Sequence, residues 1–191
     1  MTRQALTTFR FSTETCIQQA QPKLKGNVVL SSSALDVMTD LALVRAETID
    51  PKTLLGAAEL LMINRGVRSL FVTANFPCVD GLVTAADLLG SKPTQTAVRN
   101  HIKHQDLCVE DIMTPLSDLD VIDYDELKES AVSHVVATFE KLKCTHLLIV
   151  QSAKQEGPAR IRGVISITQV ERQLAKSILA AHMVAEEKSF A

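Results

Sequence analysis

The chain has 191 residues, of which 46% are hydrophobic and 22% charged, and its formal net charge is −2. The absence of a basic excess argues against a nucleic-acid partner. No apolar run approaches the ~20 residues that span a bilayer, and the first residues lack the apolar centre of a secretion signal. The four cysteines are far apart and form no Cys-x-x-Cys pair. We therefore expect free thiols in a cytoplasmic protein, not a disulfide framework or a zinc site.

The first third of the chain predicts an arm, extended chain and a helix. Residues 1–26 have no clear period and are expected to form the arm, and residues 41–44 are expected to be extended. Asp50-Pro51 is typical of a helix start, with aspartate as the N-cap and proline in the first position. Gly66 fits the position just after the end of this helix. Its apolar face is predicted to carry Leu54, Leu55, Ala58, Leu61 and Met62.

The next segment, residues 81–88, predicts a strand that turns directly into a helix. Its sequence is Gly-Leu-Val-Thr-Ala-Ala-Asp-Leu. Thr84 suits the N-cap, and Asp87 at the third helical position can bond back to the amide of the cap. A helix N-terminus also attracts phosphate, because it carries partial positive charge and free N–H groups. The segment therefore predicts a cap, and beside it a hydroxyl and a carboxylate that can hold a sugar and a phosphate.

The second half of the chain repeats the first in the same order. Asp36-Val37-Met38-Thr39 returns as Asp111-Ile112-Met113-Thr114, and residues 66–72 return as residues 144–150. The segment 81–88 returns as residues 163–170, Gly-Val-Ile-Ser-Ile-Thr-Gln-Val. Preserved order with loops of different length indicates a duplicated unit.

The remaining elements are predicted from hydrophobic periodicity and from residues that typically start or end helices. A short helix is expected within residues 96–104, extended chain over 119–122 and a helix capped by Asp125. The apolar face of that helix is predicted to carry Ala131, Val135, Phe139 and Leu142. A last helix is expected over residues 170–183, packed within the monomer or against a partner helix. The expected organisation is an arm (1–26), a first unit (27–92), a connection (93–106), a second unit (107–175) and a C-terminal helical tail (176–191).

Two β-α-β-β-α units that open with Asp-φ-Met-Thr (φ, apolar) and close with Gly-φ-φ-Ser/Thr-x-x-Asp-like residues resemble the cystathionine-β-synthase (CBS) domain family. Pairs of these domains form a Bateman module. The resemblance covers about residues 28 to 175 and implies an α/β (α+β) fold. In this fold the two units pack sheet to sheet about a pseudo-twofold axis and leave two clefts. It also implies a regulatory adenosine ligand in the clefts, namely AMP, ADP, ATP or S-adenosylmethionine, with no tightly bound cofactor.

The resemblance implies roles for individual residues. Asp87 would accept hydrogen bonds from both ribose hydroxyls, and Thr84 would lie beside the sugar and the α-phosphate. Arg68 resembles the phosphate-contacting arginine in the gamma subunit of AMP-activated protein kinase, and His146 has the corresponding place in the second unit. Gln169 departs from the pattern because it lacks a charged acceptor for the ribose diol, so the second site is expected to be weaker. The expected ligand-binding residues are Met38, Thr39, Arg68, Thr84, Asp87, Met113, Thr114, His146, Ser166 and Gln169.

The function indicated is a non-catalytic sensor that signals to a separate protein. A structural dimerisation platform with a vestigial pocket is the alternative. A nucleotide-acting enzyme is disfavoured, because no nucleophile–base pair, Gly-rich phosphate loop or metal set is found. The carboxylates at positions 118, 120, 123 and 125 are interpreted as a solvated edge and not a magnesium site. We expect a homodimer, because a lone pair of such units exposes apolar helical faces. The candidate faces are those that carry Leu54, Leu61, Val135 and Phe139, with the tail helix from Val170.

Overall fold

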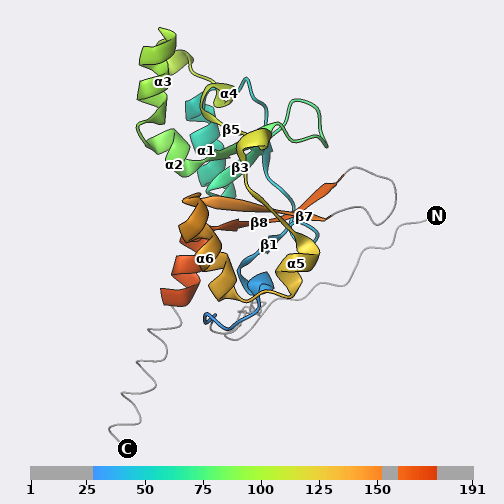
Figure 1. Cartoon of the computed structure of the whole chain (residues 1–191). Helices are drawn as coiled ribbons and strands as arrows, with labels where there is room; N and C mark the ends of the chain where they lie inside the picture. Colours follow the sequence, from blue (N-terminus) through green and yellow to red (C-terminus); the bar gives the residue numbers. More distant parts are fainter. Residues whose placement is uncertain (1–27, 152–158, 176–191) are drawn as a thin grey trace, which may run out of the picture.

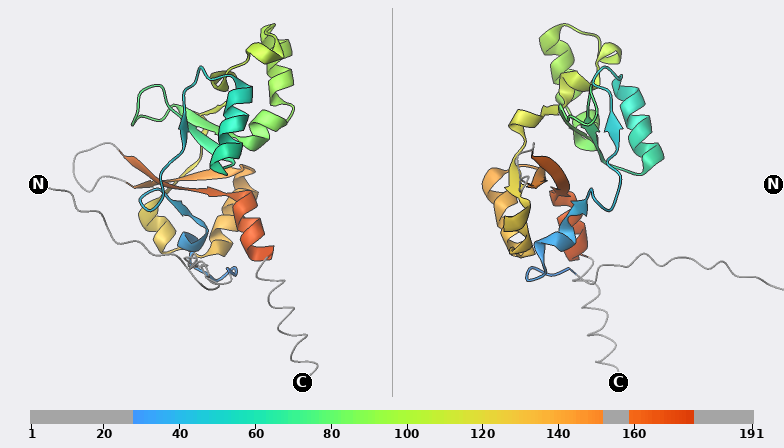
Figure 2. Two further views of the ribbon diagram at one scale, coloured as in Figure 1. Left: turned by 180° about the vertical axis from the view of Figure 1, so that it is seen from behind. Right: turned by 90° about the vertical axis from the view of Figure 1, so that its right-hand side faces the viewer.

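The computed structural model describes residues 28–151 and 159–175. The expected arm and helical tail lie outside these residues, as do residues 152–158. The described residues form two four-stranded sheets with helices on their outer faces, one half above the other in Figure 1 and in the two further views of Figure 2. No helix of the described residues is long and apolar enough to cross a membrane.

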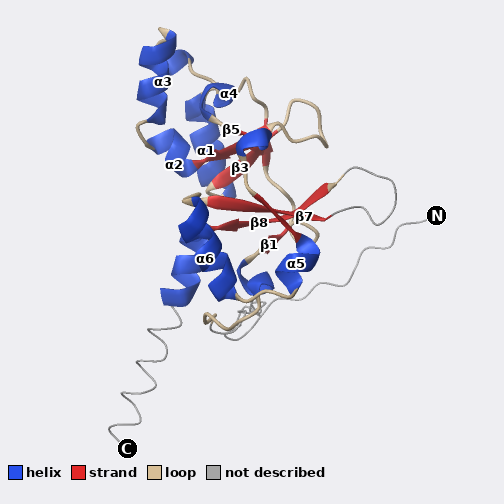
Figure 3. Cartoon of the chain, in the orientation of Figure 1, coloured by secondary structure: helices blue, strands red, loops and turns tan. Residues whose placement is uncertain are grey.

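Each sheet contains four short strands (Figure 3). One sheet has the order β2 (Thr48–Ile49), β3 (Ser69–Val72), β4 (Gly81–Thr84) and β5 (Thr114–Pro115). The other has the order β1 (Thr39–Asp40), β8 (Arg160–Ser166), β7 (His146–Gln151) and β6 (Val121–Asp123). Phe71 and Leu82 from the first sheet form one buried cluster with Leu148 from the second. The two sheets therefore pack face to face, and the expected α+β fold of two such units is confirmed.

Each sheet takes one edge strand from the other half of the chain. β1 pairs antiparallel with β8, with Thr39 opposite Val164. β5 pairs antiparallel with β4, with Thr114 opposite Leu82. The Met-Thr segment of each repeat consequently lies against the glycine motif of the other repeat, which ties the two halves together.

The helices cover the outer face of each sheet and complete two apolar cores. Six have defined bounds: α1 (Leu55–Arg65), α2 (Ala85–Leu89), α3 (Lys92–Asn100), α4 (Val109–Ile112), α5 (Tyr124–Lys128) and α6 (Val132–Leu142). Residues 167–175 form a further helix. Short 3₁₀ turns are η1 (Ala34–Val37), η2 (His104–Asp106) and η3 (Leu116–Asp118).

The apolar face predicted for α1 is partly correct, and the one predicted for α6 is more buried than expected. Leu55, Ala58 and Met62 are buried in the core, as predicted, whereas Leu54 is half exposed. In α6, Val135 and Phe139 are each 2% exposed and belong to the core of the second sheet. The expectation that these two residues form an exposed dimer face is therefore wrong.

The predicted start of α1 at Asp50-Pro51 is wrong, although its predicted end is correct. The Asp50 carboxylate accepts a hydrogen bond from the amide of Lys52 at 2.8 Å, and this closes a turn instead of a helix. Leu54 then stays extended, because it forms a β-bridge with Cys108, and the helix begins one residue later. Gly66 ends the helix in the left-handed conformation, with φ of 65°, which glycine adopts without strain.

Three other local expectations are corrected. Residues 41–44 form a turn and not extended chain, because the amides of Leu43 and Val44 both bond to the carbonyl of Asp40. The single helix expected to start at Asp125 and to carry Val135 and Phe139 is two helices, α5 and α6, and α5 is capped by Asp123, whose carboxylate accepts from the amide of Asp125 at 2.7 Å. α3 begins at Lys92, earlier than expected, because proline is accommodated in a first helical turn.

Candidate functional site

A cleft of about 500 Å³ lies where the two halves of the chain meet. Both repeats line it, through segments at 39–47, 66–71, 84–86, 145–146 and 164–172. The cleft brings together six of the ten expected site residues: Thr39, Arg68, Thr84, His146, Ser166 and Gln169. The other four, Met38, Asp87, Met113 and Thr114, do not line it. The hydroxyls of both motifs thus open into one shared cleft.

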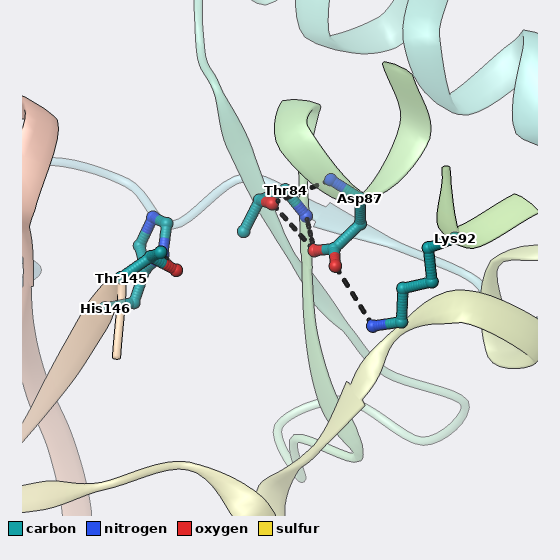
Figure 4. Close-up of polar contacts among 5 residues, drawn as sticks. All are labelled: Thr84, Asp87, Lys92, Thr145 and His146. Atoms are coloured by element: carbon teal, nitrogen blue, oxygen red, sulfur yellow. Dashed lines mark hydrogen bonds and ion pairs between the residues drawn. The ribbon is translucent and has the colours of Figure 1, made fainter. Parts of the chain in front are cut away.

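Thr84 and Asp87 form the predicted capping box at the start of α2 (Figure 4). The amide of Asp87 donates to the Thr84 hydroxyl at 3.2 Å, and the amide of Thr84 donates to Asp87 Oδ2 at 2.9 Å. The Thr84 hydroxyl also donates to the same Oδ2 at 2.7 Å. The cap expected from the sequence is therefore present with both of its bonds.

The other Asp87 oxygen is held by a residue that the sequence did not single out. Lys92 Nζ donates to Asp87 Oδ1 at 3.0 Å, and the Asp87 side chain is 17% exposed. Lys92 comes from the first turn of α3, so its approach to Asp87 depends on how α3 folds back on α2. In Figure 4, Thr84 lies between Asp87 and His146. The carboxylate thus serves three donors of its own chain.

The second motif is capped by one bond and contributes more of the cleft wall. The amide of Gln169 donates to Ser166 Oγ at 3.2 Å. Thr168, Gln169 and Arg172 follow in the helix of residues 167–175 and all line the cleft. Arg172 was missed, because an arginine on the exposed face of a predicted helix carries no signal of a site by itself.

The charged groups in the cleft give it a positive balance. Arg45, Arg68 and Arg172 line it and are exposed, and no ion pair joins any of the three to a carboxylate within the described residues. Glu47 also lines the cleft, but Arg65 Nε lies 3.5 Å from its Oε2. A concave surface with free guanidinium groups attracts and orients phosphate.

His146 begins β7 and lies across the cleft from Thr84 (Figure 4). Burial lowers the pKa of His146 below its ordinary value of 6.5, and the negative charge of Asp87 offsets part of this effect. Its Nδ1 lies 3.0 Å from the Thr145 hydroxyl. At neutral pH the ring is therefore neutral, and Nε2 can exchange a hydrogen bond with a bound molecule.

Apolar side chains form another part of the cleft lining. Leu41, Val44 and Ala46 come from the chain between β1 and β2, and Phe71 and Val164 come from the two sheets. A wall of this size and chemistry suits a flat aromatic group, while the hydroxyls and arginines suit a sugar phosphate.

The methionines of the repeated motif lie at the two seams between the halves, where β1 pairs with β8 and β5 pairs with β4. A Cβ built at Gly163 would lie 2.6 Å from Met38 Sδ, and one at Gly81 would lie 3.2 Å from Met113 Sδ. Each methionine therefore packs directly on the glycine of the other repeat, which explains the pairing of these motifs within the fold.

No family model matches the sequence, and no curated protein matches it significantly. Solved structures do resemble the chain. A CBS-domain-containing protein from Agrobacterium tumefaciens, ATU1752, matches with a TM-score of 0.52 and 17% identity, over 80% of this chain and 98% of that one. CBSX2, solved in complex with AMP, matches with a TM-score of 0.51 and 20% identity, over 76% and 97%. The CBS domain pair of protein MJ0100, solved with 5′-methylthioadenosine and S-adenosyl-L-methionine, matches with a TM-score of 0.50 and 14% identity, over 78% and 98%.

Proposed function

Since the chain has the fold of a tandem pair of CBS domains, we propose that it is a non-catalytic regulatory module that binds an adenosine-containing ligand. In this proposal the ligand occupies the shared cleft in a cytoplasmic protein, and its binding is read by a separate partner protein. The observation that carries the proposal is the combination, in one cleft, of an apolar wall, two motif hydroxyls and three arginines that have no carboxylate partner in the part of the chain that the structure describes.

The chemistry of the cleft suggests how the ligand lies. The base packs on the apolar wall of Leu41 and Val44, and the ribose lies near the motif hydroxyls of Thr84 and Ser166. The phosphate reaches Arg68, which stands between the two halves. Two of the similar structures hold ligands of this kind, AMP in one and S-adenosyl-L-methionine with 5′-methylthioadenosine in the other. The proposal extends that ligand class to this chain.

Calorimetric titration tests the proposal directly. We expect AMP, ADP or ATP to bind more tightly than adenosine, because the arginines contribute only when a phosphate is present. S-adenosyl-L-methionine is titrated in parallel, because its positive sulfonium group is repelled by the arginines of the cleft. Failure of all four adenosine ligands to bind at millimolar concentration would contradict the proposed function.

We also propose a homodimer, through the exposed face of α1 and α2. Leu60, Ile63 and Leu89 are 61%, 66% and 68% exposed on these two helices. A groove of about 280 Å³ runs beside them, with Met62 and Leu88 in its lining. Apolar side chains grouped on one face favour association, and a twofold arrangement buries the same face of both copies.

Ile63→Asp is expected to convert the dimer to a monomer, because a carboxylate buried at an apolar contact lacks a partner. Val98→Asp is the matched control, since Val98 is 72% exposed on α3 and does not line the groove. Light scattering measures the mass of wild type and both variants. A monomeric wild type at micromolar concentration would rule out the dimer. A dimeric wild type that binds no nucleotide would favour a structural dimerisation platform.

A further inference from the structure

The seam between β1 and β8 contains an ion pair. Arg162 Nη2 donates to Asp40 Oδ2 at 2.9 Å, and the two side chains are 27% and 16% exposed. The guanidinium group of Arg162 also lies over the ring of Tyr124, 5.0 Å from its centroid. An ion pair that is partly shielded from water and stacked on an aromatic ring holds its geometry better than an exposed pair.

The same aspartate shapes the turn that follows β1. The amide of Ala42 donates to Asp40 Oδ1 at 2.8 Å, and the amides of Leu43 and Val44 donate to its carbonyl at 3.0 Å each. One carboxylate oxygen thus holds the turn, while the other is held by Arg162. The turn carries Leu41 and Val44, and both line the cleft.

The corresponding seam between β4 and β5 lacks this ion pair. Its backbone bond is the same, because the amide of Leu116 donates to the carbonyl of Asp80 at 2.9 Å, as the amide of Leu41 donates to that of Arg162. The side chains differ: Pro115 stands where β1 has Asp40, and Asp80 stands before the motif glycine where β8 has Arg162. Only the seam that borders the cleft is therefore braced by an aspartate and an arginine at these positions.

We propose that Asp40 and Arg162 are positioning residues that preorganise residues 41–44 as the wall for the base of the ligand. The inference rests on the proposed function and adds to it a source of affinity for the base of the ligand. Ordering an apolar loop at the moment of binding costs free energy, and a loop already fixed in its bound shape avoids that cost. The ion pair thus raises affinity for ligands that carry a base without touching the ligand.

Arg162→Gln tests this inference, because it removes the ion pair and leaves the backbone bond to Leu41. We expect the dissociation constant for AMP to rise about three- to tenfold, as for loss of a shielded charge pair. The dissociation constant for ribose 5-phosphate, which has no base to meet the wall, is expected to stay unchanged. Asp40→Asn is a second variant, since its amide oxygen can still accept from Ala42 while the charge is lost.

Lys128→Gln is the matched control. Lys128 Nζ lies 5.6 Å from the centroid of the same Tyr124 ring, but its ion pair, at 2.7 Å, is with Asp125 Oδ1 and not with the aspartate that holds residues 41–44. The Lys128→Gln variant is expected to bind AMP with the affinity of wild type. Hydrogen exchange gives a readout without ligand: the amides of Ala42, Leu43 and Val44 should exchange faster in Arg162→Gln than in wild type.

The outcomes separate the two proposals. If wild type binds no AMP, the proposed function fails, and this inference fails with it. If wild type binds AMP but Arg162→Gln binds it equally well, the proposed function stands and the positioning role is wrong. Equal loss of affinity for AMP and ribose 5-phosphate would also overturn the inference, because a general loss of structure has no preference for the base.

Discussion

Gly81→Ala and Gly163→Ala are each expected to destabilise the protein by about 1–3 kcal/mol, as overpacking in a filled interior does. A Cβ at Gly81 would lie well within 3.0 Å of the Thr114 carbonyl oxygen, and one at Gly163 would lie 2.8 Å from the Thr39 carbonyl oxygen. Both contacts are with backbone of the strand that crosses from the other repeat. That strand must move away, and its ladder bonds weaken.

Thermal unfolding measures this effect, with a decrease in Tm of roughly 3–10 °C for a chain of this length. Gly56→Ala is the matched control, because Gly56 lies in α1 and a Cβ there meets nothing within 4 Å. Alanine is preferred to glycine in a helix by about 0.5–1 kcal/mol, so this variant should be more stable than wild type. If Gly81→Ala and Gly163→Ala melted like wild type, the strands would not pair as closely as described.

Local features of the fold could be predicted from the sequence, whereas the pairing of each edge strand with the sheet of the other repeat could not. The capping box of Thr84 and Asp87 and the end of α1 at Gly66 depend on neighbours in the chain, so pattern alone predicts them. The pairing of Thr39 with Val164 depends on residues far apart in sequence. Nothing local to either segment indicates that partner.

The turn at residues 41–44 shows tertiary context overriding pattern. Leu-Ala-Leu-Val is a short apolar run of the kind that fits a buried strand, yet Leu43 is 81% exposed and Asp40 closes the turn before it. A short polar side chain that bonds to following amides competes with the strand ladder. The apolar residues then serve the cleft, where Leu41 and Val44 form part of its wall.

The site shows the same limit. The sequence indicated the motif residues, because a hydroxyl residue followed three places on by a polar residue recurs in both repeats. It could not indicate that Lys92 takes one oxygen of Asp87, or that Arg45 and Arg172 join Arg68 in the cleft. These neighbours are set by how α3 packs on α2 and by how the two halves of the chain meet. The role of Asp87 as a ribose acceptor stays a prediction, and it requires the carboxylate to release at least one of its present donors.

Arg68→Gln is expected to weaken binding of AMP about 10- to 100-fold. A hydrogen bond to a charged group contributes about 1.5–3 kcal/mol, and each 1.4 kcal/mol corresponds to a factor of ten in affinity. Arg68 lines the cleft between the halves of the chain and has no carboxylate partner within the described residues, so its charge is available to a phosphate. Glutamine keeps a polar side chain but loses the charge. The fold should be little affected, because Arg68 is exposed and lies outside the cores.

Calorimetry with AMP and with adenosine separates the phosphate contact from the rest of the site. The Arg68→Gln variant should bind adenosine as tightly as wild type does, because adenosine has no phosphate that Arg68 could contact. Arg99→Gln is the matched control: it changes the net charge equally, and Arg99 lies at the end of α3, where its Nε donates to Asn100 Oδ1 at 3.4 Å. Equal weakening of AMP binding in both variants would indicate a general effect of net charge. Undiminished binding in Arg68→Gln would place the phosphate elsewhere, with Arg45 and Arg172 as the remaining cations of the cleft.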